Sequence, residues 1–383
     1  MQAKSKISSI WKDSDAGVGY RSGISLHSHT SLSEESLMFI HKMFVFVPGL
    51  RQVFEHYERK SKSAGFELDF VSAHWRPPLL PKMAYDVEAG QIQKLGLEAM
   101  VSLTDHDTIE APMFLRTVTS SRHIPVSVEW TAPFGVTEFH LGVHNLPTAD
   151  GAEWMRRFVT YTAMPDDAKL LAMLRELDDM PGVMVVLNHP VWDLHKVGDE
   201  VHRRELVRFV EAAGTTIHAL ELNGLRSARE NRVVTRLARE TGHLLISGGD
   251  RHSLEPNANI NLTRATSFRE FVEEVRVERR SHILFMQQYA RPWEQRMLHS
   301  TLDAVTDFPE FIAGWRRWDE RCFHRDRDGV MKPMSTLWAD GKAPLPLRAA
   351  IEFVRMGRSR TFKRSFSLAF RGSHDPAAEM ELL

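Results

Sequence analysis

The chain has 383 residues, of which 43% are hydrophobic and 26% charged, and its formal net charge is −1. This is the composition of an ordinary globular protein, and a charge so near zero gives no global attraction to nucleic acid or to an anionic membrane. The single cysteine, Cys322, excludes an internal disulfide framework and fits a reducing compartment. Because the first residues lack the apolar core of a signal peptide and no stretch resembles a membrane span, we expect a cytoplasmic protein that does not bind membranes.

Apolar segments with strand character alternate with helical patterns along most of the chain. Strands are expected at residues 23–27, 99–104, 124–129, 138–143, 183–188, 218–222 and 244–248. Helices are expected at residues 86–98, 167–178, 202–213 and 226–241. This alternation indicates an α/β protein built on a parallel sheet or barrel.

Residues 38–84 interrupt this alternation after the first expected strand. The segment begins with an apolar half that becomes more polar, and a Trp-Arg-Pro-Pro-Leu-Leu-Pro stretch follows. It leaves the main domain within ten residues of His29. We therefore expect either a lid that covers part of the functional site and restricts entry to small substrates, or a packing or oligomer contact.

The last hundred residues carry no strand pattern. Helices are expected at residues 293–305, 309–322 and 345–356. The predicted organisation is therefore an N-terminal segment at 1–19, a main domain at 20–288 and a helical C-terminal extension at 289–383. The stretch from Phe353 to Gly372 is basic and has no acidic residue. It is either a solvated basic face or a contact to a phosphate backbone.

Six histidines, one glutamate and one aspartate lie where the expected strands end, which is where α/β barrels build their sites. They occur as Leu26-His27-Ser28-His29-Thr30, Thr104-Asp105-His106-Asp107-Thr108, Val128-Glu129 followed by His140, Asn188-His189-Pro190 and Gly249-Asp250-Arg251-His252. His27 and His29 are two residues apart, so on a strand both point to the same face. Imidazole and carboxylate ligands together suit zinc, manganese or iron. The set predicts a polynuclear metal site whose chemistry is metal-activated water.

In the same order, the segments LHSHTSLSEE, LTDHDT, VSVEW, FHLGVH, LNHP and GGDRHS resemble the motifs of the PHP (polymerase and histidinol phosphatase) family of metal-dependent phosphoesterases. The resemblance covers roughly residues 20–288. It implies a distorted (β/α)7 barrel of the PHP type, with an insertion after strand 1, that hydrolyses a phosphate mono- or diester of a small metabolite or nucleotide. An exonuclease acting on nucleic-acid ends and a non-catalytic metal-binding scaffold are the alternatives. Neutral net charge disfavours nucleic acid, and the intact ligand set disfavours the scaffold.

The resemblance also implies two or three divalent transition-metal ions. One is expected between His27, His29, Glu129 and Asp250, and a second, bridged by Glu129, at His140 and His189. A third would take His106, His252 and an acidic residue after Ser33. Family members commonly have Asp or, one residue later, His there, whereas this chain has Glu34 and Glu35. We predict Glu34 as the ligand, with Glu35 as the alternative. Glu129, Asp250 and His140 are expected to carry the catalysis.

Other residues near the motifs have two alternative roles each. Asp105 is expected to orient an imidazole or to cap its loop. Glu221 and Asn223 end the sixth expected strand and either support the site or are an ordinary polar pair. Arg251 could bind a substrate phosphate, although strand alternation points it the other way. The indole rings of Trp130 and Trp192 either line the pocket of the metal site or pack in the barrel.

Overall fold

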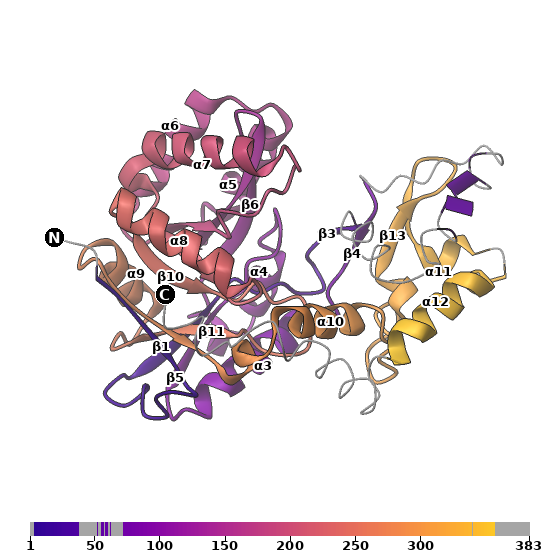
Figure 1. Ribbon diagram of the computed structural model, residues 1–383, viewed down its shortest axis with the longest axis horizontal. Coiled ribbons are helices and arrows are strands. Elements are labelled where there is room, and N and C mark those ends of the chain that lie inside the picture. The colour runs from indigo at the N-terminus through magenta and orange to yellow at the C-terminus, as the bar shows by residue number, and fades with distance from the viewer. Residues whose placement is uncertain are drawn as a thin grey trace. The chain divides into compact units, whose positions relative to one another are not determined.

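The computed structural model describes residues 4–37, 52, 55–56, 58–59, 62, 72–338 and 340–356 (Figure 1). Contacts divide the chain into two compact units. The described residues of the first unit lie in Met1–Ser33 and Leu79–Met297, and those of the second lie in Glu34–Pro78 and Leu298–Gly372. The second unit is thus built from parts of both the predicted insertion and the predicted C-terminal extension. Within the described residues, no helix is long and apolar enough to cross a membrane.

The first sheet of the first unit has the strand order β1-β12-β11-β2-β5. Its strands are β1 (Lys4–Ser9), β2 (Ser22–Leu26), β5 (Glu98–Ser102), β11 (Asn259–Thr263) and β12 (Arg280–Phe285). β2 and β5 pair in parallel, and every residue of β2 is buried. Helix α3 (Pro81–Gln93) packs on β2 so closely that a Cβ at Gly23 would lie 2.7 Å from Ile92, which explains the glycine.

The second sheet of this unit has the order β10-β9-β8-β7-β6. Its strands are β6 (Val126–Phe134), β7 (Thr137–Leu146), β8 (Met184–Asn188), β9 (Ala219–Asn223) and β10 (Leu244–Gly248). The last three are parallel to one another, whereas β7 is antiparallel to both β6 and β8. Helices α6 (Asp167–Asp178) and α8 (Ala228–Thr241) pack beside β8 and β9 (Figure 1).

The remaining helices of the first unit are α4 (Glu110–Leu115), α5 (Gly151–Ala163), α7 (Asp199–Ala213) and α9 (Phe268–Arg276). Apolar side chains of α5 and α7 fill the core against the β6–β7 hairpin. Trp130 is fully buried and stacks on Phe158 with ring centroids 4.3 Å apart, and Phe139 stacks on Phe209 at 4.9 Å. Trp130 therefore packs in the core and does not wall a pocket.

The seven expected strands and the four expected helices of the main domain are all present, with shifts of a few residues at some ends. The unit is a mixed α/β structure, but a closed (β/α)7 barrel is not found in the described part of the chain. Two isolated parallel bridges connect the two sheets, between Ser28 and Arg251 and between His106 and Glu129. Both bridges lie within the predicted metal motifs.

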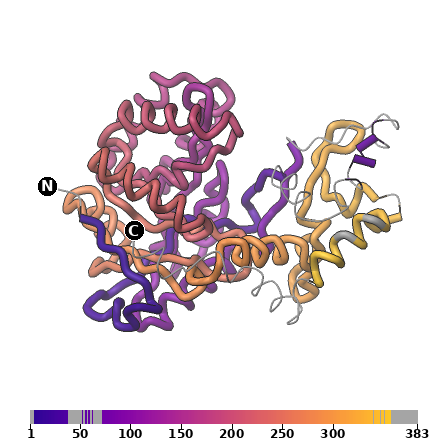
Figure 2. The backbone as a smooth tube through the Cα atoms, viewed as in Figure 1, coloured from indigo at the N-terminus to yellow at the C-terminus, as the bar shows by residue number. Residues whose placement is uncertain are grey.

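The second unit contains a four-stranded sheet of order β14-β13-β4-β3. Its strands are β3 (Glu35–Ser36), β4 (His74–Trp75), β13 (Cys322–Arg325) and β14 (Met331–Pro333). β4 and β13 are far apart along the chain and pair antiparallel, as the tube in Figure 2 allows the reader to follow. The expectation of a C-terminal extension without strands is therefore wrong, because β13 finds its partner in the insertion.

Helices α10 (Trp293–Ala304), α11 (Met334–Leu337) and α12 (Leu345–Met356) follow the main domain. The helix expected at 309–322 is wrong, since that segment contains only the short 3₁₀ helix η5 (Trp318–Glu320). The buried guanidinium of Arg321 donates there to the carbonyls of Trp315 and Thr306, and these bonds fix an irregular path for the backbone. Most of the predicted lid and the basic stretch beyond Met356 lie outside the described residues, so both hypotheses stay predictions.

Candidate metal centre

The structure brings eight of the predicted ligands together in the first unit: Glu129 and His140 lie within β6 and β7, and the other six follow strand ends. They are His27, His29, His106, Glu129, His140, His189, Asp250 and His252. Three of them have left-handed backbone conformations, with φ of 61° at His27, 26° at His189 and 55° at Asp250. Non-glycine residues rarely adopt this region, and such strain concentrates at functional sites. These three side chains therefore reach the cluster from backbone conformations that are unfavourable for non-glycine residues.

Glu129 lies at the centre of the cluster, and its two carboxylate oxygens face different histidines. Oε2 is 3.0 Å from Nε2 of His27, 3.2 Å from Nε2 of His29 and 3.3 Å from Nδ1 of His106. Oε1 is 3.1 Å from Nδ1 of His140 and 3.1 Å from Nε2 of His189. A carboxylate placed in this way can share its oxygens between two cations.

Asp250 lies on the side of His27 and His29 and turns one oxygen, Oδ1, toward three histidines. Oδ1 is 3.6 Å from Nε2 of each of these histidines and 3.5 Å from Nδ1 of His252. The ring of His29 stacks between those of His252 and His106, with centroids 4.2 and 4.7 Å away. Potential ligand atoms of all three histidines lie within 4.8 Å of one another.

The electrostatics of the cluster favour a positive charge inside it. Burial alone would lower the pKa of His27, but the carboxylates of Glu129, Glu221 and Asp250 raise it well above its usual value. Burial would raise the pKa of Glu129, yet the surrounding imidazoles, with His27 first, hold it well below its usual range. The protein thus places buried carboxylates where a cation must offset them.

Two central atoms are consistent with metal coordination. Nε2 of His27 and Oε2 of Glu129 are buried and have no hydrogen-bond partner of acceptable geometry among the described residues. Buried polar atoms are nearly always hydrogen-bonded, and a metal ion would use the lone pairs of both. The donor set of imidazole nitrogen and carboxylate oxygen fits zinc, manganese or iron.

Glu221 and Asn223 support the centre from β9. Glu221 Oε1 is 2.5 Å from Nδ1 of His27, and Oε2 accepts from the backbone N–H of His189 at 2.7 Å. Asn223 Nδ2 donates to Glu221 Oε2 at 2.8 Å and to Asp250 Oδ2 at 3.3 Å. A carboxylate on the far nitrogen of a histidine fixes the ring and raises its basicity as a ligand.

Arg251 is buried and points away from the cluster. Its Nε donates to Glu88 Oε1 at 2.7 Å, and Nη2 donates to the carbonyl of His29 at 2.9 Å. Glu88, in α3, also accepts from Ser25 Oγ at 2.8 Å and from the backbone N–H of Asn257 at 3.1 Å. Arg251 therefore joins the first and last motifs, and its guanidinium has no exposed face for a substrate phosphate.

Asp105 and Asp107 stabilise the loops that carry the histidines. Asp105 accepts from the backbone N–H of Thr30 at 2.5 Å and from its hydroxyl at 2.7 Å. Asp107 accepts from the backbone N–H of Thr131 at 2.9 Å. Asp105 thus fixes the turn just after His29, as the loop-capping alternative describes.

Glu34 belongs to none of the candidate metal groups among the described residues. Its Oε1 is 2.7 Å from Nη2 of Arg76 and 3.4 Å from Nε2 of His74, both in the second unit. Its side chain is about half exposed, whereas Glu35 is buried within β3. The acidic ligand of a third metal therefore stays a prediction.

Several residues that the sequence analysis did not single out contribute to this centre. Asn188 Nδ2 donates to Glu129 Oε1 at 3.0 Å. Ser33 Oγ accepts from the backbone N–H of His106 at 3.1 Å and lies 3.2 Å from Nδ1 of His29. Asn188 directly precedes His189, so its strand-end position was a usable signal. The sequence also carried a signal for Glu88, because a charged residue on the core face of a helix needs a buried partner.

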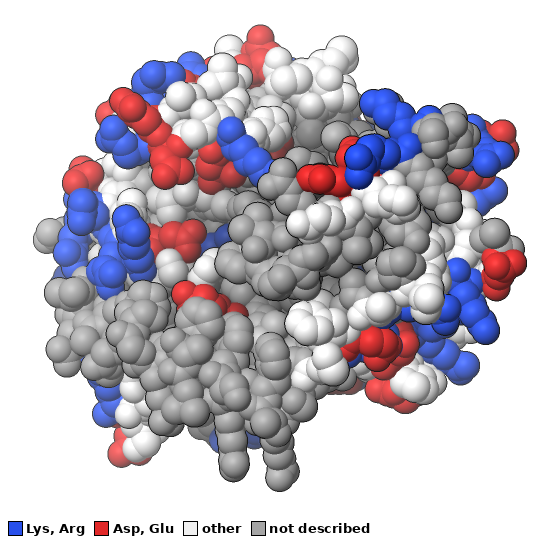
Figure 3. All heavy atoms as spheres, turned by 45° about the vertical axis from the view of Figure 1, so that its right-hand side comes forward, with Lys and Arg blue, Asp and Glu red and all other residues white. Residues whose placement is uncertain are grey.

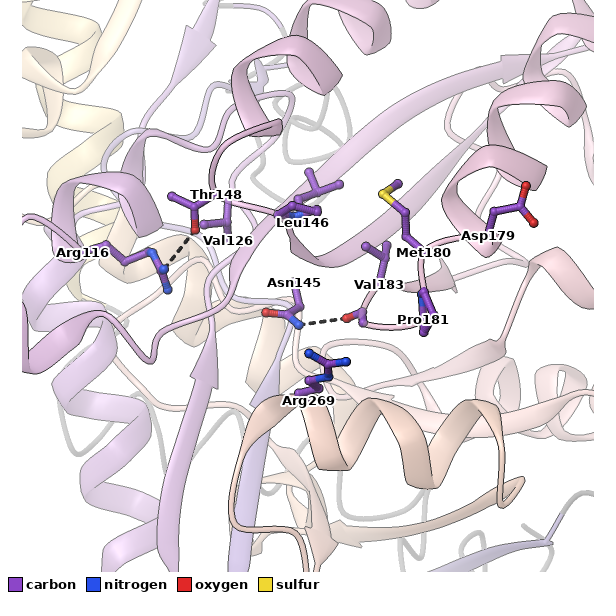
Figure 4. Close-up of a pocket in the computed structure, with 12 residues that line it drawn as sticks. Arg116, Val126, Asn145, Leu146, Thr148, Asp179, Met180, Pro181, Val183 and Arg269 are labelled. Atoms are coloured by element: carbon purple, nitrogen blue, oxygen red, sulfur yellow. Dashed lines mark hydrogen bonds between the residues drawn. The ribbon is translucent and has the colours of Figure 1, made fainter.

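A separate cavity of about 470 Å³ lies at the other end of β8 (Figure 4). Its lining includes Asn145, Val183, Arg116 and Arg269. Arg116 donates to Thr148 Oγ1 at 2.9 Å, and Asn145 donates to the carbonyl of Gly182 at 2.8 Å. None of the clustered histidines or carboxylates lines this cavity.

Comparison with known proteins gives structural neighbours only. No family model matches the chain, and no curated protein matches it. PsfC from Pseudomonas syringae is 12% identical with a TM-score of 0.42, over 74% of this chain and 97% of its own. An amidohydrolase from Chromobacterium violaceum with bound sulfate and no metal is 15% identical with a TM-score of 0.34, over 60% of this chain and 87% of its own.

A two-domain protein from Bacteroides vulgatus, containing a predicted PHP-like metal-dependent phosphoesterase, is 14% identical with a TM-score of 0.41, over 73% of this chain and 71% of its own. The structural neighbours thus include PHP-like proteins. Identities and TM-scores this low leave the functional inference to the residues of the site.

Proposed function

We propose that the chain is a metal-dependent phosphoesterase that hydrolyses a phosphate ester of a small metabolite or nucleotide. The observation that carries the proposal is Glu129, whose two oxygens face separate groups of histidines. The chain would hold one metal ion with His27, His29 and Asp250 and another with His140 and His189. The described residues offer a third group at His106 and His252.

Metal ions bound there would supply a water of lowered pKa and would offset charge on the phosphoryl oxygens. The residues of the chain hold and orient that arrangement. Glu221 keeps Nδ1 of His27 engaged, so that Nε2 faces the centre. Asn188 fixes the carboxylate of Glu129 from the side of His140. Burial of these groups excludes bulk water and strengthens their electrostatic effect.

We further propose that seven strands of the first unit, two from the first sheet and all five from the second, form a distorted barrel. Backbone bonds across both seams support this, from Asp250 N–H to the carbonyl of His27 at 2.7 Å and from Glu129 N–H to the carbonyl of Asp105 at 3.2 Å. With the seams counted, β2, β5, β6, β7, β8, β9 and β10 would follow one another around the proposed barrel.

We propose that the substrate is a small phosphorylated molecule and not nucleic acid. On the face drawn in Figure 3, basic and acidic side chains of the described residues are interspersed. Proteins that follow a nucleic-acid backbone need a clustered basic surface. This charge distribution supports a small phosphorylated substrate.

The experiment is a phosphoesterase screen with zinc, manganese and iron supplied in turn, on wild type and on Glu129→Gln. A neutral amide cannot bridge two cations, so the variant should lose turnover and at least half of its bound metal while its circular dichroism stays native. Glu205→Gln is the control, because Glu205 is a buried glutamate that pairs with Arg208 outside the centre. Full metal content and near-native turnover in Glu129→Gln would contradict the proposal.

A further inference from the structure

The loop after β9 carries an arginine beside the metal centre. The backbone N–H of Arg226 donates to Asn223 Oδ1 at 3.2 Å, and its carbonyl accepts from Nη2 of Arg296 at 2.8 Å. Both of these partners are buried. The backbone of Arg226 is therefore fixed by the fold, which limits where its side chain can lie.

The guanidinium of Arg226 is supported on one face. Its Cζ lies 3.4 Å from the centroid of the Trp192 ring, and Trp192 meets His189 edge-on at 5.1 Å. Its Nη2 is 3.8 Å from Asp250 Oδ2, which is too long for a hydrogen bond. Its Nε is buried and, among the residues that the structure describes, has no hydrogen-bond partner. A stacked guanidinium with unused donors is suited to bidentate contact with an anion.

Exposure places Arg226 at the opening of the centre. The side chains of Glu129, His27 and Asp250 are 0, 1 and 2% exposed, so they form the floor. Partly exposed side chains border the opening, and they are His106 at 17%, His252 at 14%, Arg226 at 11% and His140 at 9%. The guanidinium of Arg226 is therefore one of the partly exposed groups that lie beside the buried carboxylates.

The two arginines near Asp250 differ in one decisive respect. The guanidinium of Arg251 donates hydrogen bonds to Glu88, to the carbonyl of His29 and to the carbonyl of Ser253. Among the residues that the structure describes, no side-chain hydrogen bond involves the guanidinium of Arg226, whose approach to Asp250 is an ion pair at 3.8 Å. Arg226 is thus the available cation and Arg251 the structural one.

We propose that Arg226, stacked on Trp192, binds a terminal phosphoryl oxygen and selects phosphate monoesters over diesters. This inference rests on the proposed function and names its substrate class. A monoester carries two negative charges and three terminal oxygens, so that metal ions held on the two sides of Glu129 would leave an oxygen available to a protein donor. A diester has one charge fewer, and one of these oxygens carries a second organic group, so it gains less from a guanidinium.

The test compares wild type with Arg226→Met and Arg226→Lys, all loaded with manganese. The measurements are the kinetics with p-nitrophenyl phosphate and with bis(p-nitrophenyl) phosphate, calorimetric binding of inorganic phosphate, and metal content. Arg226→Met should raise the KM for the monoester and the Kd for phosphate about 10–100-fold, as expected for loss of a charged hydrogen bond. Diester turnover should change by less than about threefold, and metal content should not change. Arg226→Lys should recover part of the phosphate affinity, since it keeps the charge but not the planar fork.

Arg208→Met is the matched control, because that guanidinium lies 4.3 Å from the ring centroid of Phe134 in a contact outside the centre. It should behave as wild type. Loss of metal in Arg226→Met would assign the residue to the support of Asp250 and overturn the proposal, as would an equal loss with monoester and diester. If wild type hydrolyses neither ester but still binds phosphate through Arg226, anion binding stands and the phosphoesterase function fails.

Discussion

Replacing Arg251 by methionine should destabilise the first unit far more than loss of an exposed ion pair. The side chains of Arg251 and Glu88 are 2 and 0% exposed, so the variant leaves a carboxylate buried without its charge partner. Glu88 would keep its bonds from Ser25 and Asn257, which offset only part of that cost. Breaking such a pair costs about 3–5 kcal/mol, and we expect that loss in the free energy of unfolding.

Urea denaturation of metal-free protein, followed by circular dichroism, measures this loss. The double variant Glu88→Gln/Arg251→Met removes both charges. Its loss in free energy of unfolding should be about 2 kcal/mol smaller than the sum of the losses in the two single variants. Arg21→Met is the control, because Arg21, which precedes β2, pairs with Glu98 of β5 and both side chains are more than half exposed. It should cost less than about 1 kcal/mol. If Arg251→Met costs no more than Arg21→Met, the buried pair does not hold the first and last motifs together.

Three further outcomes follow. Burial lowers the pKa of His144 to about 3, so the unfolded state takes up a proton below pH 6.5 and the folded state does not. The free energy of unfolding should therefore fall by about 1.5–2 kcal/mol between pH 6.5 and 5. In a pH series this fall should be shallower in His144→Gln, and an equal fall in both proteins would show that the buried imidazole is not neutral. Trp130→Ala should cost about 3–5 kcal/mol, because it opens a cavity beside Phe158, yet metal analysis should find its metal content unchanged. Chelation should lower the melting temperature, and added manganese or zinc should restore it, since metal bound at about a thousandfold above its Kd contributes about 4 kcal/mol. An unchanged melting curve would argue against an internal metal.

The sequence was sufficient to locate the strands that carry the motifs, because β2, β5, β8 and β10 are short apolar runs that polar residues follow. The longer β6 and β7 extend beyond the expected runs, so that Glu129 lies inside its strand and does not end it. The sequence analysis missed β1, β11 and β12. These strands come from the two ends of the first unit's sequence and form one mixed sheet with β2 and β5. β11 reads NINLT, and its asparagines are buried because they donate to Leu222 and Ser247 in β9 and β10 of the other sheet. Their polarity therefore concealed a core strand.

Residue spacing could indicate which histidines share a face, but not which partner each polar side chain would take. For Asp105 the sequence left two roles open, orienting an imidazole or capping its loop, and the structure shows bonds from Thr30 to its carboxylate. Arg226 carried no signal, since an arginine after a strand is ordinary until its neighbours are known. Its contact with Trp192 joins two loops 34 positions apart, which only the tertiary structure reveals.

The pairing of β4 with β13 has a consequence for synthesis. His74 and Phe323 lie opposite each other in the second unit. A ribosome adds about 5–20 residues per second, so β4 is made some tens of seconds before its partner strand. During that time the β3–β4 ladder has an open edge, of the kind that chaperones bind and that other chains can extend. Early termination anywhere before Cys322 would leave the insertion permanently without β13, so truncated products should be prone to aggregation even when the first unit is whole.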